Sequence, residues 1–418
     1  MKKIVTVSIL FLQAIVFAQQ PVSLEQCYEA ATANYPLAKK ITLLEQQNKL
    51  DTEVLQTANK PQLFLDAQAT YQSDVIELPV SLPNVLIEPP NQDQYKATLS
   101  VNQLIYNGGV IKASIEAKKA EGKAQQKAVE VSLYQLKKQI NNSYFSILLL
   151  QEKQQLLEAK KDRLQARLKE VKAGIKYGTL LPSSDSVLEA EVLKITQQQE
   201  EIRIQKQALF TTLSSITGIK LTQNTILETP TLPENITNTI NRPELDLFKL
   251  QKQQIDATRK VISKQNAPKI LGFATGGYGN PGLNMLDNSF QPFYIVGAKL
   301  NWNVFDWNTK KKQEQSLQIN KQIITNQEEV FKLNTRVEMD TYRSAVNTYS
   351  AYLATDQEII KLREKIVKTA ESQLKNGVIT ASTYITELTN LFEAKNNASV
   401  HRIQLLRSKA NYQITQGN

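Results

Sequence analysis

The side chains that could carry out chemistry are few, and their spacing does not form an active site. The chain contains one histidine, His401, and one cysteine, Cys27. Protein metal sites are built from several such ligands, so these two residues do not make a metal centre. The sequence also lacks a serine–histidine–aspartate pattern, a phosphate-binding loop and a dinucleotide-binding glycine motif. We therefore expect no enzyme activity and no cofactor.

Each of these residues has a structural interpretation. A lone cysteine cannot form an intramolecular disulfide, and we expect Cys27 to be a small buried side chain. His401 falls on a helical pattern at the position that matches Ile202, where we expect it to pack into the helix seam. The glycine-rich run 276–279 is expected before a loop, whereas a phosphate cradle needs a helix to follow. We interpret this run as a strand end followed by a loop, where glycine allows tight turning.

The elements that hold these residues are encoded twice in the chain. The matching pairs are Pro36 with Pro243, Pro61 with Pro268, and 101–107 with 300–306. A repeat of roughly 200 residues is too long for a solenoid, so each copy must be a substantial unit. We predict a signal peptide over 1–18, a first repeat over 19–220, a linker over 221–240 and a second repeat over 241–418.

The N-terminus has the pattern of an exported protein. Lys2 and Lys3 precede an apolar run over 4–17, and Ala18 provides a small residue at the cleavage site. This run is too short to span a bilayer, and no later segment approaches the about 20 apolar residues that a transmembrane helix needs. We expect an exported mature chain without a transmembrane helix.

Each repeat contains a very long helical pattern followed by a return helix. Helices are predicted over about 37–59, 109–176, 183–217, 244–266, 308–376 and 382–415. Apolar residues recur at alternating steps of three and four, as in a coiled coil. The polar interruptions of this seam are Ser143, Gln154, Lys161, Asp356 and Arg363. Each repeat should therefore contain an antiparallel helical hairpin, whose long helix extends on the order of 100 Å.

Between the short and the long helices, apolar and polar residues alternate with a period of two. The apolar positions are Leu63, Leu65, Ala67, Ala69, Tyr71, Tyr95, Ala97, Leu99, Val101, Ile105, Tyr294, Val296, Ala298, Leu300, Trp302 and Val304. This pattern indicates four strands of about 10 to 13 residues, the length of a tilted transmembrane strand. A half-buried soluble hairpin gives the same alternation. If the strands span a membrane, several chains must share one barrel, because four strands cannot close.

Together, the signal peptide, strand pairs, helical hairpins and duplication resemble the TolC-like family of outer-membrane efflux proteins. The most specific segments are the strand-to-helix junctions 103–109 and 303–307 and the hairpin tips 177–180 and 376–379. The resemblance implies an α+β membrane protein that forms a homotrimer. Its twelve strands would form one shared transmembrane β-barrel, and its coiled-coil hairpins would form an α-barrel in the periplasm.

The resemblance also implies a function. The chain would be the passive outer-membrane exit duct of a tripartite efflux or type I secretion system in a Gram-negative bacterium. Its partners would be a periplasmic adaptor, an inner-membrane pump and outer-membrane lipid. The expected adaptor contacts are the tip residues Tyr177, Gly178, Thr179, Leu180, Gly377, Val378 and Ile379. We expect both glycines to end long helices in the left-handed conformation, flanked by the exposed apolar residues Leu180, Leu181, Val378 and Ile379.

The gate is where this chain departs from the best-known members of the family. They carry acidic residues shortly after the second tip glycine, at positions that are Thr383 and Thr386 in this chain, and Glu387 is the nearest carboxylate. We take these three residues as gate candidates. Our hypothesis is that packing and neutral hydrogen bonds mainly hold the closed tip, and that its cation preference is weak.

The basic residues of the chain outnumber the acidic ones. The net charge is +10, and the basic residues are scattered over helix faces without a nucleic-acid motif, so we expect no nucleic-acid partner. The run 310–312 follows a strand end, where its lysines could meet lipid headgroups.

Two alternative functions stay open, a periplasmic adaptor and an exported coiled-coil scaffold, although the duplication counts against both. Only a duct should need detergent for extraction and migrate as a trimer.

Overall fold

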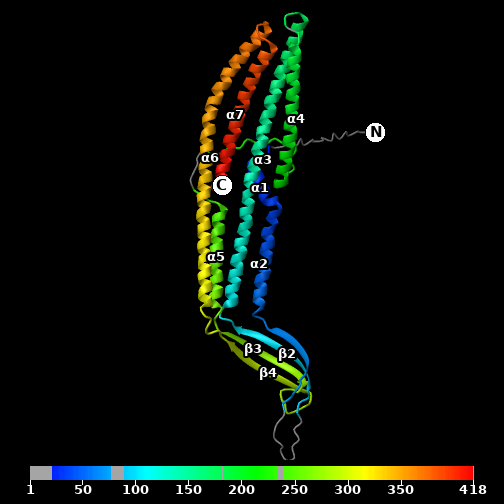
Figure 1. Cartoon of the computed structure of the whole chain (residues 1–418), viewed down its shortest axis with the longest axis vertical. Coiled ribbons are helices and arrows are strands. Elements are labelled where there is room, and N and C mark those ends of the chain that lie inside the picture. Colours follow the sequence, from blue (N-terminus) through cyan, green and yellow to red (C-terminus); the bar gives the residue numbers. More distant parts are fainter. Residues whose placement is uncertain (1–20, 77–88, 181, 234–238, 418) are drawn as a thin grey trace, which may run out of the picture. The chain divides into compact units, whose positions relative to one another are not determined.

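The computed structural model describes residues 21–76, 89–180, 182–233 and 239–417. The predicted signal peptide over 1–18 and part of the predicted linker over 221–240 lie outside these residues. The elements, in chain order, are α1 (Leu24–Asn34), the 3-10 helix η1 (Pro36–Ala38), α2 (Lys39–Thr57), β1 (Gln62–Tyr71), β2 (Asp93–Tyr106), α3 (Val110–Lys176), α4 (Ser184–Thr217), α5 (Pro243–Lys264), β3 (Lys269–Asn280), β4 (Gln291–Asn301), α6 (Thr309–Lys375) and α7 (Ala381–Gln416) (Figure 1).

The order of short helix, two strands, long helix and return helix occurs twice, as α2 to α4 and as α5 to α7. All six predicted helices are present, with ends within two residues of the predicted ones. Helix α1 was not predicted from the sequence. Its start carries a capping box, in which Ser23 and Gln26 bond each other's backbone N–H groups at 3.2 and 3.0 Å. This serine-to-glutamine spacing was the signal that could have revealed the helix.

The compact units of the fold do not coincide with the sequence repeats. One unit, the hairpin unit, comprises the described residues of Met1–Ala38, Glu130–Arg242 and Lys332–Asn418. The other, the strand unit, comprises those of Lys39–Val129 and Pro243–Phe331. Each unit therefore draws on both halves of the sequence, and α3 and α6 contribute to both units.

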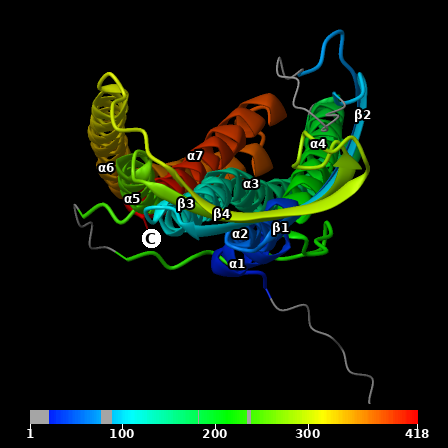
Figure 2. The ribbon, with the colours of Figure 1, turned by 90° about the horizontal axis from the view of Figure 1, so that it is seen from below.

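The strand unit contains a four-stranded antiparallel sheet in the order β1-β2-β3-β4. The central pair, β2 with β3, joins the two halves of the sequence, with Val101 opposite Ala274. The sheet is visibly curved (Figures 1 and 2). Its outer strands, β1 and β4, each leave one edge without a partner strand among the described residues. Within those residues, no helix is both long enough and apolar enough to cross a membrane.

The two faces of the sheet differ in polarity, as the alternation predicts. We call the side formed by the following residues the apolar face: Leu63, Leu65, Ala67, Ala69, Tyr71, Tyr95, Ala97, Leu99, Val101, Ala274, Tyr278, Tyr294, Val296, Ala298 and Leu300. Much of it is uncovered within the chain, with Leu65 78 % and Val296 72 % exposed. The opposite, polar face includes Ser100 and Thr275, whose hydroxyl oxygens lie 3.0 Å apart.

The glycine-rich run 276–279 lies at the end of β3 and a loop follows it, as expected, although its residues are still paired with the neighbouring strands. A Cβ atom at Gly277 would lie 2.3 Å from the ring of Phe293, and one at Gly297 would lie 2.8 Å from the ring of Phe273. The two rings therefore cover glycine backbone on the neighbouring strand. The ammonium group of Lys96 lies 4.9 Å from the centroid of Phe293, which adds a cation–π contact on the polar face.

In the strand unit, α2 and α5 each pack beside the first part of a long helix. Asn48 of α2 donates from Nδ2 to the carbonyl of Lys118 in α3 at 2.6 Å. This approach requires glycine at position 122, because a Cβ atom there would lie 2.4 Å from the Asn48 amide nitrogen. Between α5 and α6, the corresponding connection is an ion pair of Lys252 with Glu328 at 2.7 Å.

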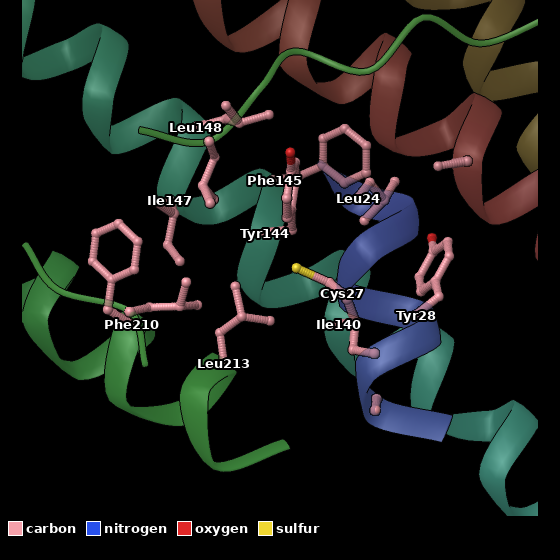
Figure 3. Close-up of a cluster of buried hydrophobic side chains, with 14 of the residues drawn as sticks. Leu24, Cys27, Tyr28, Ile140, Tyr144, Phe145, Ile147, Leu148, Phe210 and Leu213 are labelled. Carbon is pink, nitrogen blue, oxygen red and sulfur yellow. The ribbon is translucent and has the colours of Figure 1, made fainter. Parts of the chain in front are cut away.

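The hairpin unit has a buried core in which α1 packs against α3 and α4 (Figure 3). Cys27 is completely buried there, as expected, and burial raises the pKa of its thiol to about 12. The hydroxyl oxygen of Tyr144 lies 2.8 and 2.6 Å from the carbonyl oxygens of Val22 and Glu228. These contacts fasten the segments before α1 and after α4 to the long helix.

Two polar interruptions of the α3 seam have partners on the return helix α4. The ammonium group of Lys206 donates to the Gln154 amide oxygen at 2.9 Å, and that of Lys161 donates to Gln199 at 3.2 Å. Lys206 is buried, and this burial lowers its pKa. Because each polar group meets a partner across the seam, these contacts favour one axial register of the hairpin.

The two polar interruptions of the α6 seam are likewise paired with the return helix α7. Asp356 is buried, and its Oδ2 lies 2.7 Å from Nδ1 of His401. His401 thus packs at the seam as predicted, but with a carboxylate partner that the sequence analysis did not assign. Arg363 pairs with Glu387, with Nη1 and Oε2 3.4 Å apart.

Removal of His401 should destabilise the protein, because Asp356 is buried beside it. We expect His401→Ala to lower the free energy of unfolding by about 1 to 3 kcal/mol, because a buried acceptor loses its partner. The matched double variant, Asp356→Leu with His401→Leu, should recover most of this loss. Circular dichroism during denaturant unfolding measures both effects. A double variant less stable than His401→Ala would contradict the assignment.

Candidate functional site at the two hairpin turns

The predicted tip glycines end the two long helices in the same way. Gly178 has φ +71° and Gly377 has φ +72°, the left-handed conformation that was expected. At the first turn, the N–H groups of Gly178 and Thr179 donate to the carbonyls of Ile175 and Gly174 at 3.1 and 2.9 Å. This pair of bonds is a Schellman motif.

The second turn repeats the motif. Gly377 and Val378 donate to the carbonyls of Leu374 and Gln373 at 3.0 and 2.8 Å. A Cβ atom at Gly377 would lie 3.5 Å from the Thr179 carbonyl oxygen, so the two turns lie next to each other within the hairpin unit. The fold therefore brings the predicted tip residues of both sequence halves together.

The side chains at the turns are less exposed than expected. Tyr177 and Val378 are 76 % and 69 % exposed. Leu180 and Ile379 are only partly exposed, because both pack against the buried cluster behind the turns. The expectation that both are exposed is therefore wrong, and their packing against this cluster is the reason. Leu181 lies outside the described residues.

The cluster behind the turns combines all four hairpin helices. Its buried members are Leu164, Val171, Leu188, Ile195, Val367, Ala370, Leu374, Ala381, Tyr384, Leu388 and Leu391. Most of these residues are apolar seam positions, so the heptad pattern that builds the helices also fixes the turns. The turns are consequently held by packing on the inside and are open to solvent at Tyr177 and Val378.

Ion pairs also connect the two hairpins near the turns, which the sequence analysis did not predict. Glu371 of α6 pairs with both Arg163 and Arg167 of α3, and its Oε2 lies 3.2 Å from Nη2 of Arg163. The guanidinium of Arg167 also lies over the ring of Tyr384, 5.6 Å from its centroid. The two arginines are four residues apart and so share a helix face, which was the available signal.

A third basic residue of α3 contacts both return helices. The buried ammonium group of Lys160 lies 2.8 Å from Glu191 of α4 and donates to the hydroxyl of Thr389 in α7 at 3.2 Å. Charged contacts therefore accompany packing in this region. The helices behind the tips are joined by more than the neutral hydrogen bonds of the gate hypothesis.

The gate candidates have three different local roles. Thr383 lies in the first turn of α7, where its N–H donates to the capping hydroxyl of Thr380 at 3.2 Å. The exposed Thr386 bonds the carbonyl of Ser382 at 3.1 Å. Glu387 is half-buried, because it pairs with Arg363. The one carboxylate among the three candidates thus has its charge partly compensated within the chain.

The tip region can position and contact, but it offers no catalytic arrangement. Among the described residues, no group of three or more His, Cys, Asp or Glu side chains is placed to hold a metal ion. What the geometry provides is two adjacent glycine turns, an apolar core behind them and compensated charges around them. Such a site suits a protein contact or a passage.

Comparisons with known proteins give a family match and a set of similar folds. Residues 28–218 match the family model described as outer membrane efflux protein. No curated protein matches the chain in sequence. The solved structure of CusC is 13 % identical, with a TM-score of 0.72 over 94 % of this chain and 92 % of that chain.

Two further structures have the same fold. The outer membrane protein VceC from Vibrio cholerae is 15 % identical, with a TM-score of 0.68 over 94 % of this chain and 96 % of that chain. The CmeC outer membrane channel of Campylobacter jejuni is 14 % identical, with a TM-score of 0.68 over 94 % of this chain and 85 % of that chain. Long helical hairpins and four antiparallel strands per chain are thus a shared architecture.

Proposed function

The chain belongs to the outer membrane efflux protein family, and from this premise we propose that it is the exit duct of a tripartite efflux or type I secretion system. Three copies would place their strands in the outer membrane of a Gram-negative bacterium and their helices in the periplasm. The observation that carries the proposal is a sheet whose apolar face is exposed and whose two edges are open.

The polarity of the sheet supports a membrane position. An exposed row of large apolar side chains is unfavourable in water, and Leu65, Tyr294 and Val296 are each more than 70 % exposed. Lipid removes that cost, but it requires every backbone N–H and C=O to be paired, which only a closed barrel achieves for strands. Four strands are too few to close, and three copies would supply twelve.

The opposite face suits a water-filled passage. Ser100, Thr275 and Lys299 lie on it, and Lys96 stands over the ring of Phe293. A duct lined in this way conducts solutes without binding them tightly, since few convergent groups are available to hold one molecule. The proposal therefore assigns no chemical step to this chain, and the energy for transport would come from an inner-membrane pump.

We place the adaptor contact at the two turns. Tyr177 and Val378 present exposed aromatic and apolar surface beside backbone that carries no side chain at Gly178 and Gly377. This combination allows a partner to approach the main chain closely. The contact would also involve Thr179, Leu180 and Ile379. The last two pack against the buried cluster behind the turns.

The passage near the turns should discriminate only weakly between ions. Ion preference in a narrow pore depends on uncompensated rings of charge. Thr383 and Thr386 are neutral, and Arg363 offsets the charge of Glu387. We therefore propose that the closed gate is held by packing, by neutral hydrogen bonds that cap the helix and by paired charges.

The lipid assignment can be tested by placing arginine on either face. Arg at Val101 or Ala298 should cost about 2 to 4 kcal/mol near the bilayer midplane, whereas Ser100→Arg, on the polar face, should be tolerated. The yield of detergent-extracted, heat-resistant trimer measures the difference. Equal yields from the two faces would rule out the membrane barrel and with it the duct.

Bulky residues at the turns should block the adaptor. We expect Gly178→Trp with Gly377→Trp to abolish efflux while trimer formation and membrane insertion persist. The matched control is Gly178→Ala with Gly377→Ala, which imposes the same left-handed strain of about 1 to 2 kcal/mol per residue without bulk. Drug or protein export by cells that express each variant gives the readout. Full export by the Trp variant would place the docking site elsewhere.

The compensation of Glu387 makes a prediction for single channels. In bilayer recordings under a salt gradient, we expect weak cation preference that Glu387→Gln changes little. Arg363→Gln should raise the cation preference, because it removes the charge that offsets Glu387, and the double variant should return it to the starting value. A strong cation preference in the unmodified protein that vanishes in Glu387→Gln would refute the gate hypothesis.

A further inference from the structure

A groove lies in the hairpin unit where α3, α6 and α7 meet. Its volume is about 450 Å³, which is within the range of sites that hold small organic molecules. The whole lining belongs to the hairpin unit of one chain. The lining residues are Lys138, Asn142, Thr341, Tyr342, Ala345, Tyr349, Gln404, Arg407, Ser408 and Asn411.

The charge of this groove is positive. The two charged residues of its lining, Lys138 and Arg407, are both basic. Lys138 is paired with Glu338 of α6, whereas Arg407 donates from Nη2 to the amide oxygen of Asn142 at 2.7 Å. Within the described part of the chain, no carboxylate is paired with Arg407. A guanidinium carries five N–H donors in a planar fork, so most of those of Arg407 stay available to an anion.

A chain of buried hydrogen bonds orients a further donor of the groove. The Tyr28 hydroxyl donates to the amide oxygen of Asn141, and the Asn141 amide nitrogen donates to the oxygen of Asn411 at 2.8 Å. The amide nitrogen of Asn411 therefore points away from Asn141, and it has no acceptor among the described residues. Asn411 is only 7 % exposed, so its side chain is held in place. Arg407 and Asn411 are four residues apart and so share one face of α7.

The other end of the groove is aromatic. Tyr349 lies seven residues after Tyr342 on α6, which corresponds to about 10 Å along the helix axis. The ring centroid of Tyr349 is 6.3 Å from that of Tyr352 and 6.1 Å from that of His401. Glu338, the partner of Lys138, lies one turn on the other side of Tyr342. Basic and aromatic groups thus occupy opposite ends of the groove.

We propose that this groove binds aromatic carboxylates. The carboxylate accepts hydrogen bonds from the guanidinium of Arg407 and the amide nitrogen of Asn411, and Lys138 adds to the positive potential. The aromatic ring of the ligand lies against Tyr349 and extends the ring cluster there. An acid with two fused rings suits the separation of the two ends. The inference goes beyond the proposed function, because this binding needs neither a membrane nor a partner protein.

Calorimetric titration of the full chain in detergent measures the binding, with the detergent solution alone as the blank. We expect saturable binding of 2-naphthoate. Three comparison ligands isolate its parts: 2-naphthalenemethanol has the rings without the charge, acetate has the carboxylate without the rings, and inorganic phosphate is another oxyanion without rings. Each should bind at least about tenfold more weakly, the effect of one lost charged hydrogen bond or ring contact. A comparison ligand that binds as tightly as 2-naphthoate would overturn the proposal.

Asn142 allows the charge of Arg407 to be changed with little effect on the fold, because its side chain is exposed. Asn142→Asp places a carboxylate beside the guanidinium, and we expect it to weaken the binding of 2-naphthoate about tenfold. Asn142→Ala removes the amide oxygen and releases Arg407, so the binding should be as tight as before or tighter. Unfolding cannot produce this contrast between two substitutions at one exposed position.

Further variants test the two ends of the groove. Arg407→Gln should weaken the binding of 2-naphthoate about tenfold, whereas Arg203→Gln, at an exposed arginine of α4 outside the groove, should leave it unchanged. Tyr349→Leu should weaken it, and Tyr349→Phe, which keeps the ring, should not. Circular dichroism during heating verifies that each variant is folded. If the unmodified protein shows no saturable binding, or if folded Arg407→Gln and Asn142→Asp bind as tightly as it does, the proposal is wrong.

Discussion

Most of the apolar face of the sheet is left uncovered by the described residues of the strand unit, and this fact constrains most of what surrounds it. Each Å² of apolar surface left in water forgoes about 25 cal/mol, so Leu65, Tyr294 and Val296 call for a nonaqueous neighbour. A lipid neighbour brings a second requirement, because it offers no hydrogen bonds to an open strand edge. The exposed face and the unpaired edges are thus two consequences of one environment.

Although the chain is duplicated, its two halves differ at the junctions between strand and long helix. Gly108 and Gly109 have φ +65° and +82°, and a Cβ atom at Gly108 would lie 2.0 Å from that of Ala267. The matching residues in the second half are Trp307 and Asn308, with φ +55° and +62°. A tryptophan in this conformation costs about 1 to 2 kcal/mol and cannot allow the same close approach. The two strand-to-helix junctions of the chain therefore differ in their local backbone and packing.

Most of the fold could be predicted because the spacing of apolar residues differs between helices and strands. Helices α2 to α7 and the apolar alternation of the strands follow from local pattern, which is why their positions were predictable. The missed helix α1 is short, and its stability depends on packing Cys27 and Tyr28 into a distant part of the chain. The end of β4 was misplaced, since the alternation continues through Trp302 and Val304 whereas the strand ends at Asn301. Exposure of Leu180 and Ile379 could not be judged without the tertiary packing behind the turns.

A duct has no reacting atoms, so its residues matter through the register that they impose on long helices. An apolar heptad seam alone tolerates slippage by a heptad, whereas a buried Asp356 paired with His401 does not, because a slip would leave the carboxylate without its partner. Contacts between hairpins follow another rule. Glu371 faces Arg163 and Arg167, which are one helical turn apart, so a shift by one turn would still leave it an arginine. The contact of Asp356 with His401 thus fixes the register within one hairpin, whereas the pairing of Glu371 with two arginines depends less on the register between hairpins.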